Sequence, residues 1–448
     1  MKAKVLLIMP KLEAEKDFHH FPFGILALAA SLENIGVTYD IFDERIADEK
    51  DIHHQLSEYG IIGISMFTGY QTYRACYWLK LIRSWNPDAI TIVGGPHVSA
   101  LPAETAASSF VDYAFAGYAE KTFPDLVLNI LAATTKKNAL GVNLPGVYSK
   151  GMESNIVLNK IPSNYNDILW QPLPYHRLNI EKYINPATRL VMYVSQYGCP
   201  ALCTFCSTKE TRKLVSKPLS IVYKDLETLK ELTGFLKIWF ADATLFMNRA
   251  RTMELVAYLD QRFVGYEWIA DARATDLIRY SEDDLNKIKN CRATLTGIVV
   301  GLESGSERLA EQVIKKGKGH LERFTEVAKR TQAAGIKLIS GVVFGFPGET
   351  REDLNETIKY IRDIRKIHKY FTISTTFFGP LPGTELYDTV RAQGYLSQQS
   401  LEDWAAYGEE SHYKYNQWSD PPWFSAFESK EYLEGYREFM EEHGDICV

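Results

Sequence analysis

Long apolar runs are absent from this sequence of 448 residues, and so are dense clusters of lysine and arginine. No stretch reaches the roughly 20 apolar residues that a membrane-spanning helix needs. The formal net charge is −6, whereas nucleic-acid binding needs a basic footprint, so we expect neither a membrane nor a nucleic acid as a partner. The first residues, MKAKVLLIMPK, hold a five-residue apolar stretch, which is short for a signal peptide and predicts a strand.

Cysteine is also scarce, with six residues in the whole chain. Cys76, Cys291 and Cys447 are scattered and suggest no disulfide framework, so a reducing cytoplasm is the expected compartment. The other three cysteines are crowded into one short segment, GCPALCTFCST, at residues 198–208. This crowding indicates a site that the rest of the sequence has to explain.

Residues 1–139 alternate short β-branched runs with helical patterns. The runs are KVLLIMP, TYDIFD, GIIGISMF, AITIVGG and VDYAFAG. The alternation predicts an α/β, Rossmann-like, doubly wound sheet of five parallel strands, because parallel strands need crossover connections. Such sheets bind ligands beyond the carboxyl ends of their strands. In this sequence those ends hold Ser65, Gly94, Gly95 and His97, and paired glycines let a flat ligand approach the backbone.

The βα alternation resumes after a proline-containing segment, residues 140–188, which we interpret as a linker. Residues 189–390 contain six apolar runs: LVMYVSQ, LKIWFAD, YEWIADARA, TLTGIVVGLES, IKLISGVVFGF and FTISTTFFG. Six βα units predict a partial TIM-type barrel with function at the carboxyl ends of its strands. One connecting helix, TREDLNETIKYIRDIRKI, opens with Thr350 three residues before Asp353, which is typical of a helix start.

A small C-terminal extension, residues 391–448, differs in composition from the rest. From residue 401 onward it has twelve acidic residues and three basic ones, and it is rich in aromatic side chains such as Trp404 and Trp423. This aromatic content argues against disorder. The extension either covers the open barrel and shapes a substrate cavity, or packs against the fold in a plain structural role.

Three closely spaced cysteines predict a metal site. A closed zinc site takes four ligands, often as two CxxC pairs, and no second pair is present. An iron–sulfur cluster also normally takes four cysteines. Three cysteines would leave one iron of a 4Fe–4S cluster open to a small molecule. Because the segment follows the first barrel strand, at the catalytic end, such an open iron indicates a reactive site.

GCPALCTFC, a CxxxCxxC pattern with an aromatic residue before its last cysteine, resembles the signature of the radical S-adenosylmethionine superfamily. FADATLF, DARA, VGLESGSERL and GFPGET resemble the strand-end motifs of its cobalamin-dependent branch, and VGGPHVSALPAE resembles that branch's cobalamin-binding domain. The resemblance covers about residues 1–390. It implies bound cobalamin and a 4Fe–4S cluster on Cys199, Cys203 and Cys206, with S-adenosylmethionine chelating the open iron.

The resemblance also implies a set of residues that contact S-adenosylmethionine: Asp242, Arg273, Glu303, Ser304 and Phe346. Asp242 would meet the methionine amino group, although a carboxylate there can also cap a helix. Glu303 and Ser304 would meet the ribose or an amino group, or the serine would cap the next helix. Arg273 pairs either with a structural carboxylate or with that of the ligand. The backbone of the GFPGE turn, around Phe346, would contact adenine.

For cobalamin, the resemblance implies contacts from Ser65, Gly94, Gly95 and His97. The D-x-H-x-x-G motif that gives many cobalamin domains a cobalt ligand is absent after the first strand, and His19 and His20 do not fit its spacing. We therefore expect the cobalt to have no protein histidine, and His97 to contact the corrin or its nucleotide tail. The same departure leaves open a domain that binds nothing.

The resemblance implies a methyltransferase that acts on an unactivated carbon of a small-molecule or peptide substrate. One S-adenosylmethionine would methylate cobalamin, and a second would yield a 5′-deoxyadenosyl radical. A small electron donor such as flavodoxin or ferredoxin would be the protein partner. The alternatives are cyclisation, oxidation or rearrangement with the same cofactors, and a zinc-stabilised binding protein. The sequence indicates neither the substrate nor the oligomeric state.

Overall fold

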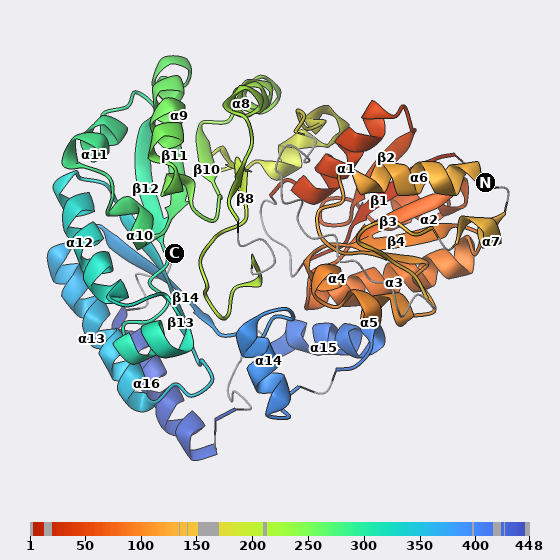
Figure 1. Cartoon of the computed structure of the whole chain (residues 1–448). Coiled ribbons are helices and arrows are strands. Elements are labelled where there is room, and N and C mark those ends of the chain that lie inside the picture. The colour runs from red at the N-terminus through yellow and green to blue at the C-terminus, as the bar shows by residue number, and fades with distance from the viewer. Residues whose placement is uncertain are drawn as a thin grey trace. The chain divides into compact units, whose positions relative to one another are not determined.

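The computed structural model describes residues 3–12, 20–133, 135–140, 142–150, 170–208, 213–396, 398–414, 423–424 and 426–443. The chain forms two compact units (Figure 1). The N-terminal unit comprises Met1–Asn185, Tyr223–Thr233 and Leu396–Gln417. The barrel unit comprises Pro186–Val222, Gly234–Tyr395 and Trp418–Val448. Both units are assembled from separate stretches of the sequence.

The N-terminal unit is built on one sheet with the strand order β2-β1-β3-β4-β5-β6. Its strands are β1 (Val5–Met9), β2 (Tyr39–Asp43), β3 (Ile61–Ser65), β4 (Ile90–Gly94), β5 (Tyr113–Phe115) and β6 (Val147–Tyr148). The first five are parallel, which confirms the expected doubly wound sheet. The sequence did not indicate β6, a two-residue strand that pairs antiparallel with β5. It lies in the segment that we interpreted as a linker, of which residues 151–169 lie outside the described ranges.

Helices cover both faces of this sheet. They are α1 (Phe23–Asn34), α2 (Lys50–His53), α3 (Tyr70–Trp85), α4 (Pro96–Ala100), α5 (Pro102–Ala107), α6 (Thr122–Ala132) and α7 (Lys136–Ala139). The face packed against α3 forms one core around Trp78 and Leu79, and the face packed against α1 and α6 forms a second core around Ile25, Phe123 and Leu126. Two cores on one sheet are the arrangement that the alternating sequence predicts.

The barrel unit contains six parallel strands in the order β14-β13-β12-β11-β10-β7. They are β7 (Leu190–Tyr193), β10 (Lys237–Phe240), β11 (Glu267–Ala272), β12 (Thr294–Val300), β13 (Leu338–Phe344) and β14 (Phe371–Phe377). Within the described ranges β7 and β14 pair on one side only, so the barrel is open, as predicted. A short hairpin, β8 (Gln196–Tyr197) and β9 (Val215–Ser216), flanks the cysteine segment.

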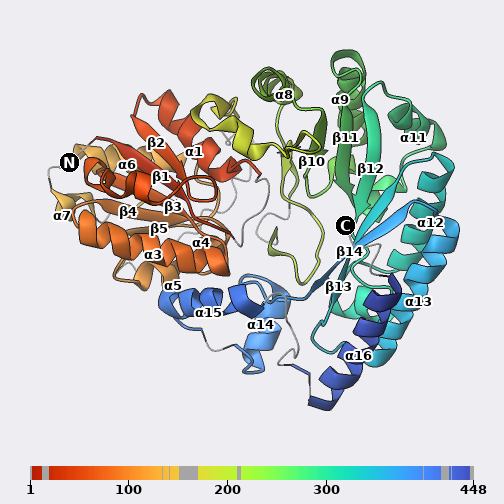
Figure 2. The same cartoon turned by 180° about the vertical axis from the view of Figure 1, so that it is seen from behind.

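The helices of the barrel unit are α9 (Arg249–Arg262), α10 (Ala274–Leu277), α11 (Glu282–Lys289), α12 (His320–Ala333), α13 (Arg351–Ile367) and α14 (Glu385–Ala392). Most of them, among them α9, α11, α12 and α13, lie along one side of the curved sheet, whereas α14 lies apart from this row (Figures 1 and 2). Helix α8 (Leu219–Thr233) begins in this unit and continues into the N-terminal unit. Thr350 and Asp353 form a capping box at the start of α13, as the sequence predicts.

The C-terminal extension is divided between the two units. Helix α15 (Leu401–Lys414) packs against α3 of the N-terminal unit, and α16 (Ala426–His443) packs against α13 of the barrel unit. Trp404 and Tyr432 are fully buried anchors of these two helices. The described helices of the extension therefore have packing roles in both units. None of the described helices is long and apolar enough to cross a membrane.

Candidate active site at the strand ends

The cysteine segment follows β7 and β8 and is fixed by Thr204. The Thr204 hydroxyl donates to the Val313 carbonyl over 2.7 Å, and the Thr204 amide donates to the Ile314 carbonyl over 3.2 Å. In turn, the Thr204 carbonyl accepts a hydrogen bond from the Leu386 amide over 3.1 Å. A buried residue in the middle of the segment therefore holds the cysteines against the end of the π-helix η7 (Leu309–Val313) and the start of α14.

Cys199, Cys203 and Cys206 are free thiols. Burial raises the pKa of Cys203, and the sulfurs of Cys206 and Cys199 raise it further because they are close enough to interact. Among the described side chains, no three His, Cys, Asp or Glu residues converge to hold a single metal ion. The ligands of a multi-iron cluster bind different irons, so they need to surround a volume rather than a point. Three neighbouring thiols on an anchored segment fit such a cluster.

A buried ion pair lies beside the cysteines. Lys316 Nζ contacts Glu303 Oε1 at 3.0 Å and lies 6.0 Å from the ring centre of Phe205, the residue before Cys206. Burial lowers the pKa of Lys316, but the Glu303 carboxylate and the cysteine sulfurs outweigh it, so the pKa lies above its ordinary value. The site therefore holds a persistent positive charge next to its thiols.

Glu303 is held in a strained conformation at the end of β12. Its φ of +65° lies in the left-handed region, which is rare for a residue with a side chain. The strain is supported by two backbone hydrogen bonds to β13, one from the Glu303 amide to the Gly341 carbonyl and one from the Val343 amide to the Glu303 carbonyl. A Cβ at Gly301 would overlap Glu303 Oε1. The chain therefore keeps space for this carboxylate and fixes its direction.

Arg273 forms a bidentate pair with Asp276, at 2.8 and 3.0 Å. Asp276 is buried and also accepts hydrogen bonds from Thr244 and Arg279. The hydrogen bond with Asp276 and the nearby Cys199 sulfur both raise the pKa of Arg273. Arg273 thus pairs with a structural carboxylate, one of the two roles that the sequence left open, and brings a second positive charge near the cysteines.

Two carboxylates follow one another on neighbouring strands. Asp242, after β10, is fully buried and accepts hydrogen bonds from the Ser195 amide, the Ser195 hydroxyl and the Gln196 amide at 2.6–2.7 Å. Asp271, near the end of β11, accepts one hydrogen bond from Trp239 Nε1 over 2.8 Å. Burial raises the pKa of Asp271 to about 7. The Asp242 carboxylate thus already accepts three hydrogen bonds from Ser195 and Gln196. Nothing in the sequence singles out Asp271.

The remaining residues predicted for S-adenosylmethionine lie in two different settings. The Ser304 hydroxyl pairs with Thr357 of α13 at 3.1 Å and accepts from the Ser306 amide, so it stabilises the local turn. Phe346 is fully buried in the GFPGE turn, with its ring centre 5.7 Å from that of Phe205. This ring contact joins the turn directly to the cysteine segment.

Side chains from the C-terminal extension hold the GFPGE turn. Tyr432 Oη accepts a hydrogen bond from the Gly345 amide over 3.1 Å, and Trp423 Nε1 donates to the Gly345 carbonyl over 2.9 Å. Inside the turn, Glu349 accepts from the Phe346 amide, and burial raises the pKa of Glu349 to about 8. The sequence indicated an ordered extension but not this contact.

In the N-terminal unit, Ser65, Gly94 and Gly95 lie at the adjacent carboxyl ends of β3 and β4. Gly95 has a φ of +110°, and a Cβ there would come 2.7 Å from the Met66 carbonyl oxygen. Only glycine fits this close approach of two backbones. The strand ends carry small residues, which leave room for a large planar ligand such as a corrin to approach the backbone.

His97 is enclosed beside this edge. Its Nδ1 pairs with the Thr68 hydroxyl at 2.9 Å, and its ring packs edge-to-face on Trp404 of α15, with centres 5.5 Å apart. Burial lowers the pKa of His97 to about 4, so the ring is neutral at physiological pH. These contacts give His97 an internal role. His20 lies on the chain before α1, while His19 is outside the described residues.

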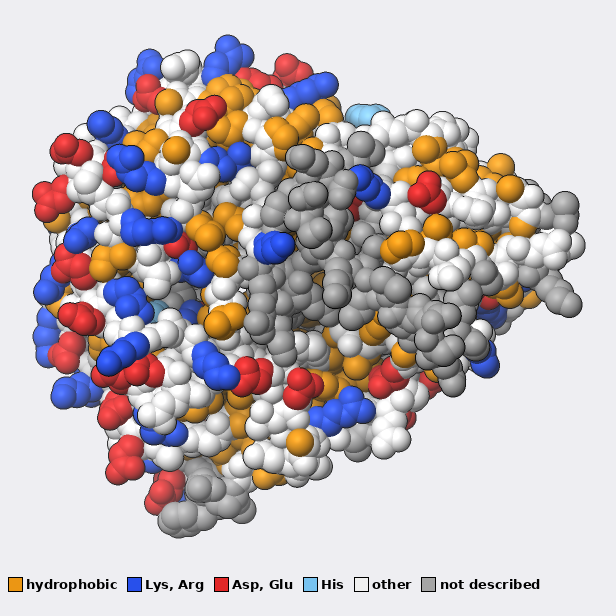
Figure 3. Space-filling view, viewed as in Figure 1, with side chains coloured by type: hydrophobic (Ala, Val, Ile, Leu, Met, Phe, Trp, Pro, Cys, Tyr) orange, Lys and Arg blue, Asp and Glu red, His pale blue; other side chains and the backbone are white. Residues whose placement is uncertain are grey.

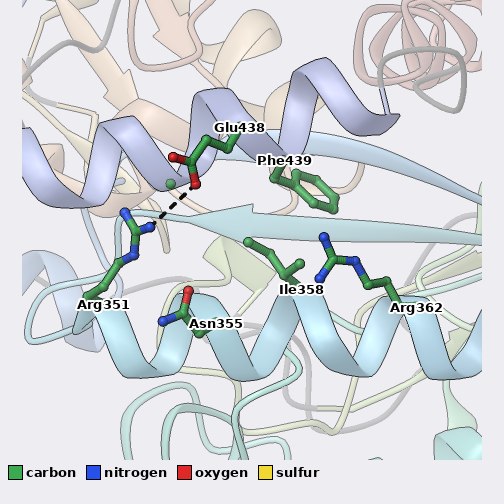
Figure 4. A pocket seen from close by; sticks show the side chains of 7 residues that line it. Arg351, Asn355, Ile358, Arg362, Glu438 and Phe439 are labelled. Carbon is green, nitrogen blue, oxygen red and sulfur yellow. Dashed lines mark ion pairs between the residues drawn. The ribbon is translucent and has the colours of Figure 1, made fainter.

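A pocket of about 300 Å³ lies between α13 and α16, on the helical layer of the barrel unit. Figure 4 shows Arg351, Asn355 and Arg362 of α13 facing Glu438 and Phe439 of α16. None of the lining residues belongs to the cysteine segment or to the set predicted for S-adenosylmethionine, so the pocket is not the candidate active site. On the same layer, acidic and basic side chains are interspersed (Figure 3), unlike the basic stripe of a nucleic-acid-binding face.

Two family models match the chain: the Radical SAM superfamily over residues 193–361 and the B12 binding domain over residues 12–127. The chain is 26% identical over 343 residues to the uncharacterized methyltransferase PH0819 of Pyrococcus horikoshii, covering 75% of this chain and 70% of that protein. It is 25% identical over 455 residues to the cytidylyl-2-hydroxyethylphosphonate methyltransferase of Streptomyces wedmorensis, covering 88% of this chain and 82% of that protein.

A solved structure shares this fold. It is the radical S-adenosylmethionine methyltransferase TsrM from Kitasatospora setae, determined with cobalamin and a [4Fe-4S] cluster bound. The TM-score is 0.71 at 16% sequence identity, and the match covers 88% of this chain and 78% of that chain. The similarity extends over both units, each of which corresponds to one of the two matching family models.

Proposed function

Because the chain belongs to the cobalamin-dependent radical S-adenosylmethionine enzymes, we propose that it is a methyltransferase that methylates an unactivated carbon of a small molecule or peptide. The observation that carries the proposal is the presence, in one chain, of a cobalamin-binding fold and of three free thiols at the strand ends of an open barrel. Its relatives with methyltransferase names support the reaction class.

When bound, the cluster with S-adenosylmethionine supplies a carbon-centred radical, and cobalamin supplies the methyl group. The three thiols of Cys199, Cys203 and Cys206 would hold the cluster, and Thr204 would keep them in place through its bonds to η7 and α14. The cationic Lys316 and Arg273 lie near the sulfurs and would offset the negative charge of thiolate ligands. These roles follow from the chain's own contacts.

The carboxylates of the barrel unit would orient the sulfonium ligand. Glu303 is aimed by its left-handed backbone and by Lys316, so it can accept hydrogen bonds in a fixed direction. We propose that Asp271, rather than the internally bonded Asp242, presents the open carboxyl group on this side of the sheet. Phe346 and Phe205 would exclude water from the edge of the cluster.

Turnover should consume S-adenosylmethionine in two ways, because donating a methyl group and forming the radical are different cleavages. The test is anaerobic reconstitution with iron, sulfide and cobalamin, followed by product analysis over a panel of candidate metabolites with a low-potential reductant. With the true substrate, S-adenosylhomocysteine and 5′-deoxyadenosine should each form in near one-to-one ratio with methylated product. Deuterium from the substrate carbon should appear in 5′-deoxyadenosine.

A different product pattern would select a different reaction. If 5′-deoxyadenosine forms with substrate while S-adenosylhomocysteine and methylated product stay absent, the enzyme performs cyclisation, oxidation or rearrangement. A colourless, air-stable preparation that contains zinc would point to a binding protein instead. The physiological reductant would be a small electron carrier such as flavodoxin or ferredoxin, in the reducing cytoplasm where free thiols and an open iron persist.

A further inference from the structure

The C-terminal helix α15 contacts the cobalamin-binding fold through its core. Figures 1 and 2 show α15 lying beside α3 within the N-terminal unit. Leu401 and Ala405 of α15 are buried in the same core as Trp78 and Leu79 of α3. A Cβ at Gly408 would overlap the Gly69 carbonyl oxygen, so the backbone of α15 touches the start of α3. One face of this sheet is therefore completed by residues about 300 positions later in the sequence.

A second set of contacts joins α15 to the loops at the strand ends. Trp404 Nε1 donates a hydrogen bond to Glu104 over 2.7 Å, and the Trp404 ring packs against His97. His97 Nδ1 in turn pairs with Thr68. Thr68 lies three residues after the end of β3, and His97 lies three residues after the end of β4. Trp404 thus contacts α4 at the His97 ring and reaches the loop after β3 through the same ring.

These loops border the position where such a sheet binds its ligand. In the strand order β2-β1-β3-β4-β5 the connections reverse direction between β1 and β3, and ligands of doubly wound sheets bind beyond the carboxyl ends at that reversal. His97 Nε2 is buried and has no hydrogen-bond partner among the described residues. The His97 ring contacts Thr68 on one side and Trp404 on the other, so it bridges the loop after β3 and helix α15.

We propose that α15 is part of the cobalamin site, and that Trp404 acts as a positioning residue that sets the loop after β3 and the helix α4 through His97. The inference rests on the proposed function, because it assumes that cobalamin binds at these strand ends. It assigns the C-terminal extension a role in binding cobalamin, which goes beyond the packing role that its burial alone requires.

The test compares variants of the full chain, loaded with its cluster, for their dissociation constant with hydroxocobalamin in equilibrium dialysis. Trp404→Ala should weaken binding by roughly tenfold, the scale expected for the loss of one buried hydrogen-bonded contact. Trp404→Phe keeps the ring contact with His97 and loses the bond to Glu104, so it should recover most of the affinity. Iron content and S-adenosylmethionine binding should stay at wild-type values in both variants.

Two controls separate positioning from stability. Leu401→Ala removes a buried aliphatic side chain of α15 that has neither an aromatic ring nor a polar group to offer His97. It should lower the melting temperature at least as much as Trp404→Phe while changing cobalamin affinity less than Trp404→Ala. Ala406→Glu adds a charge on the exposed side of α15 and should change neither quantity. A Thr68→Val change combined with Trp404→Ala should cost less than the sum of the two single changes, because both act through His97.

The outcomes are distinct. If Trp404→Ala binds hydroxocobalamin as the wild type does, or if its loss only matches that of Leu401→Ala, the inference is wrong and the proposed function stands. If the loss is additive with that of Thr68→Val, the two residues act separately and the relay through His97 is wrong. If the wild-type protein binds no cobalamin, the proposed function fails and this inference fails with it.

Discussion

The two strand-end regions of this chain are built in opposite ways. Around the cysteines of the barrel unit the fold gathers ionisable groups, including the pair formed by Lys316 and Glu303. At the corresponding edge of the N-terminal unit it places Ser65, paired glycines and a histidine whose pKa of about 4 keeps it neutral. Parallel sheets place ligands at this end in both cases, so topology gives the location and side chains give the chemistry.

The difference follows from what each edge has to hold. Thiolates and a sulfonium ion are charged, and charged groups that leave water need partners nearby. A corrin is large and flat, and small residues let it approach the backbone. The contrast predicts that substitutions of ionisable residues will strongly affect stability and cofactor binding in the barrel unit, and will affect them weakly at the strand-end edge of the N-terminal unit.

The largest effect should come from replacing Cys199, Cys203 and Cys206 together with alanine. This triple variant should lose the iron–sulfur absorbance and all cleavage of S-adenosylmethionine, because no other described cysteine lies in the segment. The matched control replaces Cys76, Cys291 and Cys447 with serine and should retain one cluster per chain, as measured by iron content. Of these, Cys447 lies outside the described residues. A cluster that survives in the triple variant would refute the assignment.

The next effect should follow from Lys316→Met, which leaves the Glu303 carboxylate without its partner. Breaking an ion pair at a site this enclosed should lower the free energy of unfolding by about 4 kcal/mol. The neighbouring Lys315→Met is a close control, because Lys315 pairs with Glu385 on the surface and should cost less than about 1 kcal/mol. Urea denaturation of both variants measures the difference. An equal loss of unfolding free energy in the two variants would mean that the pair of Lys316 and Glu303 is no stronger than a surface ion pair.

Asp271→Asn should change how stability depends on pH. The folded pKa of Asp271 is about 7 and its ordinary value is 3.8, so the folded protein binds this proton more tightly than the unfolded chain does. Wild-type stability should therefore fall as pH rises from about 4 to about 7. The advantage of Asp271→Asn over the wild type should grow by at most about 3 kcal/mol between pH 5 and pH 8.

The control for this pH effect is Asp260→Asn. Asp260 is exposed, and its hydrogen bonds with Arg292 lower its pKa, so its contribution is complete above pH 4 and should not change between pH 5 and pH 8. Denaturant titrations of both variants at the two pH values provide the measurement. Parallel behaviour of the two variants would show that Asp271 does not titrate as a buried group.

The smallest effect is expected in the cobalt spectrum of His97→Ala. Because the D-x-H-x-x-G motif is absent after the first strand, removing His97 should leave the electron paramagnetic resonance pattern of cob(II)alamin unchanged. It should weaken cobalamin binding, since His97 links Thr68 to Trp404. His19→Ala and His20→Ala should leave both the pattern and the affinity unchanged. Disappearance of a nitrogen-ligand splitting in any of the three would show that a histidine does bind the cobalt.

The sequence predicted the elements of the fold but fewer of the contacts between them. The two parallel sheets and the capping box at Thr350 follow from local periodicity and spacing, which a single chain segment carries in full. The cysteine segment could also be recognised as a candidate metal site from the sequence, because its three cysteines are close together in the chain. Their role as cluster ligands stays a prediction, as do the contacts expected from Ser304 and Phe346.

Contacts between residues that are far apart in the sequence could not be predicted from the sequence. Lys316 lies in a segment rich in lysine and glycine, a composition typical of exposed loops. It is nevertheless enclosed, because the chain turns so that Lys316 contacts Glu303. Asp242 and Asp271 both lie at the ends of barrel strands in the sequence. Only the fold shows that the Asp242 carboxylate already accepts hydrogen bonds from the amide and hydroxyl of Ser195. An aromatic residue such as Trp404 predicts burial but does not indicate against which part of the fold.

The division of the C-terminal extension has a consequence for how the protein is made. A ribosome releases the first 185 residues of the N-terminal unit long before it reaches Leu401, where the last helix of that unit begins. At roughly 5–20 residues per second, the interval is on the order of ten to forty seconds. Throughout it, the core side chains of α3 that α15 will cover remain open to water, so the nascent chain exposes an apolar surface that a chaperone can bind. Cobalamin loading should consequently follow the synthesis of α15, and a chain truncated at Tyr395, which lacks α15, should not retain the vitamin.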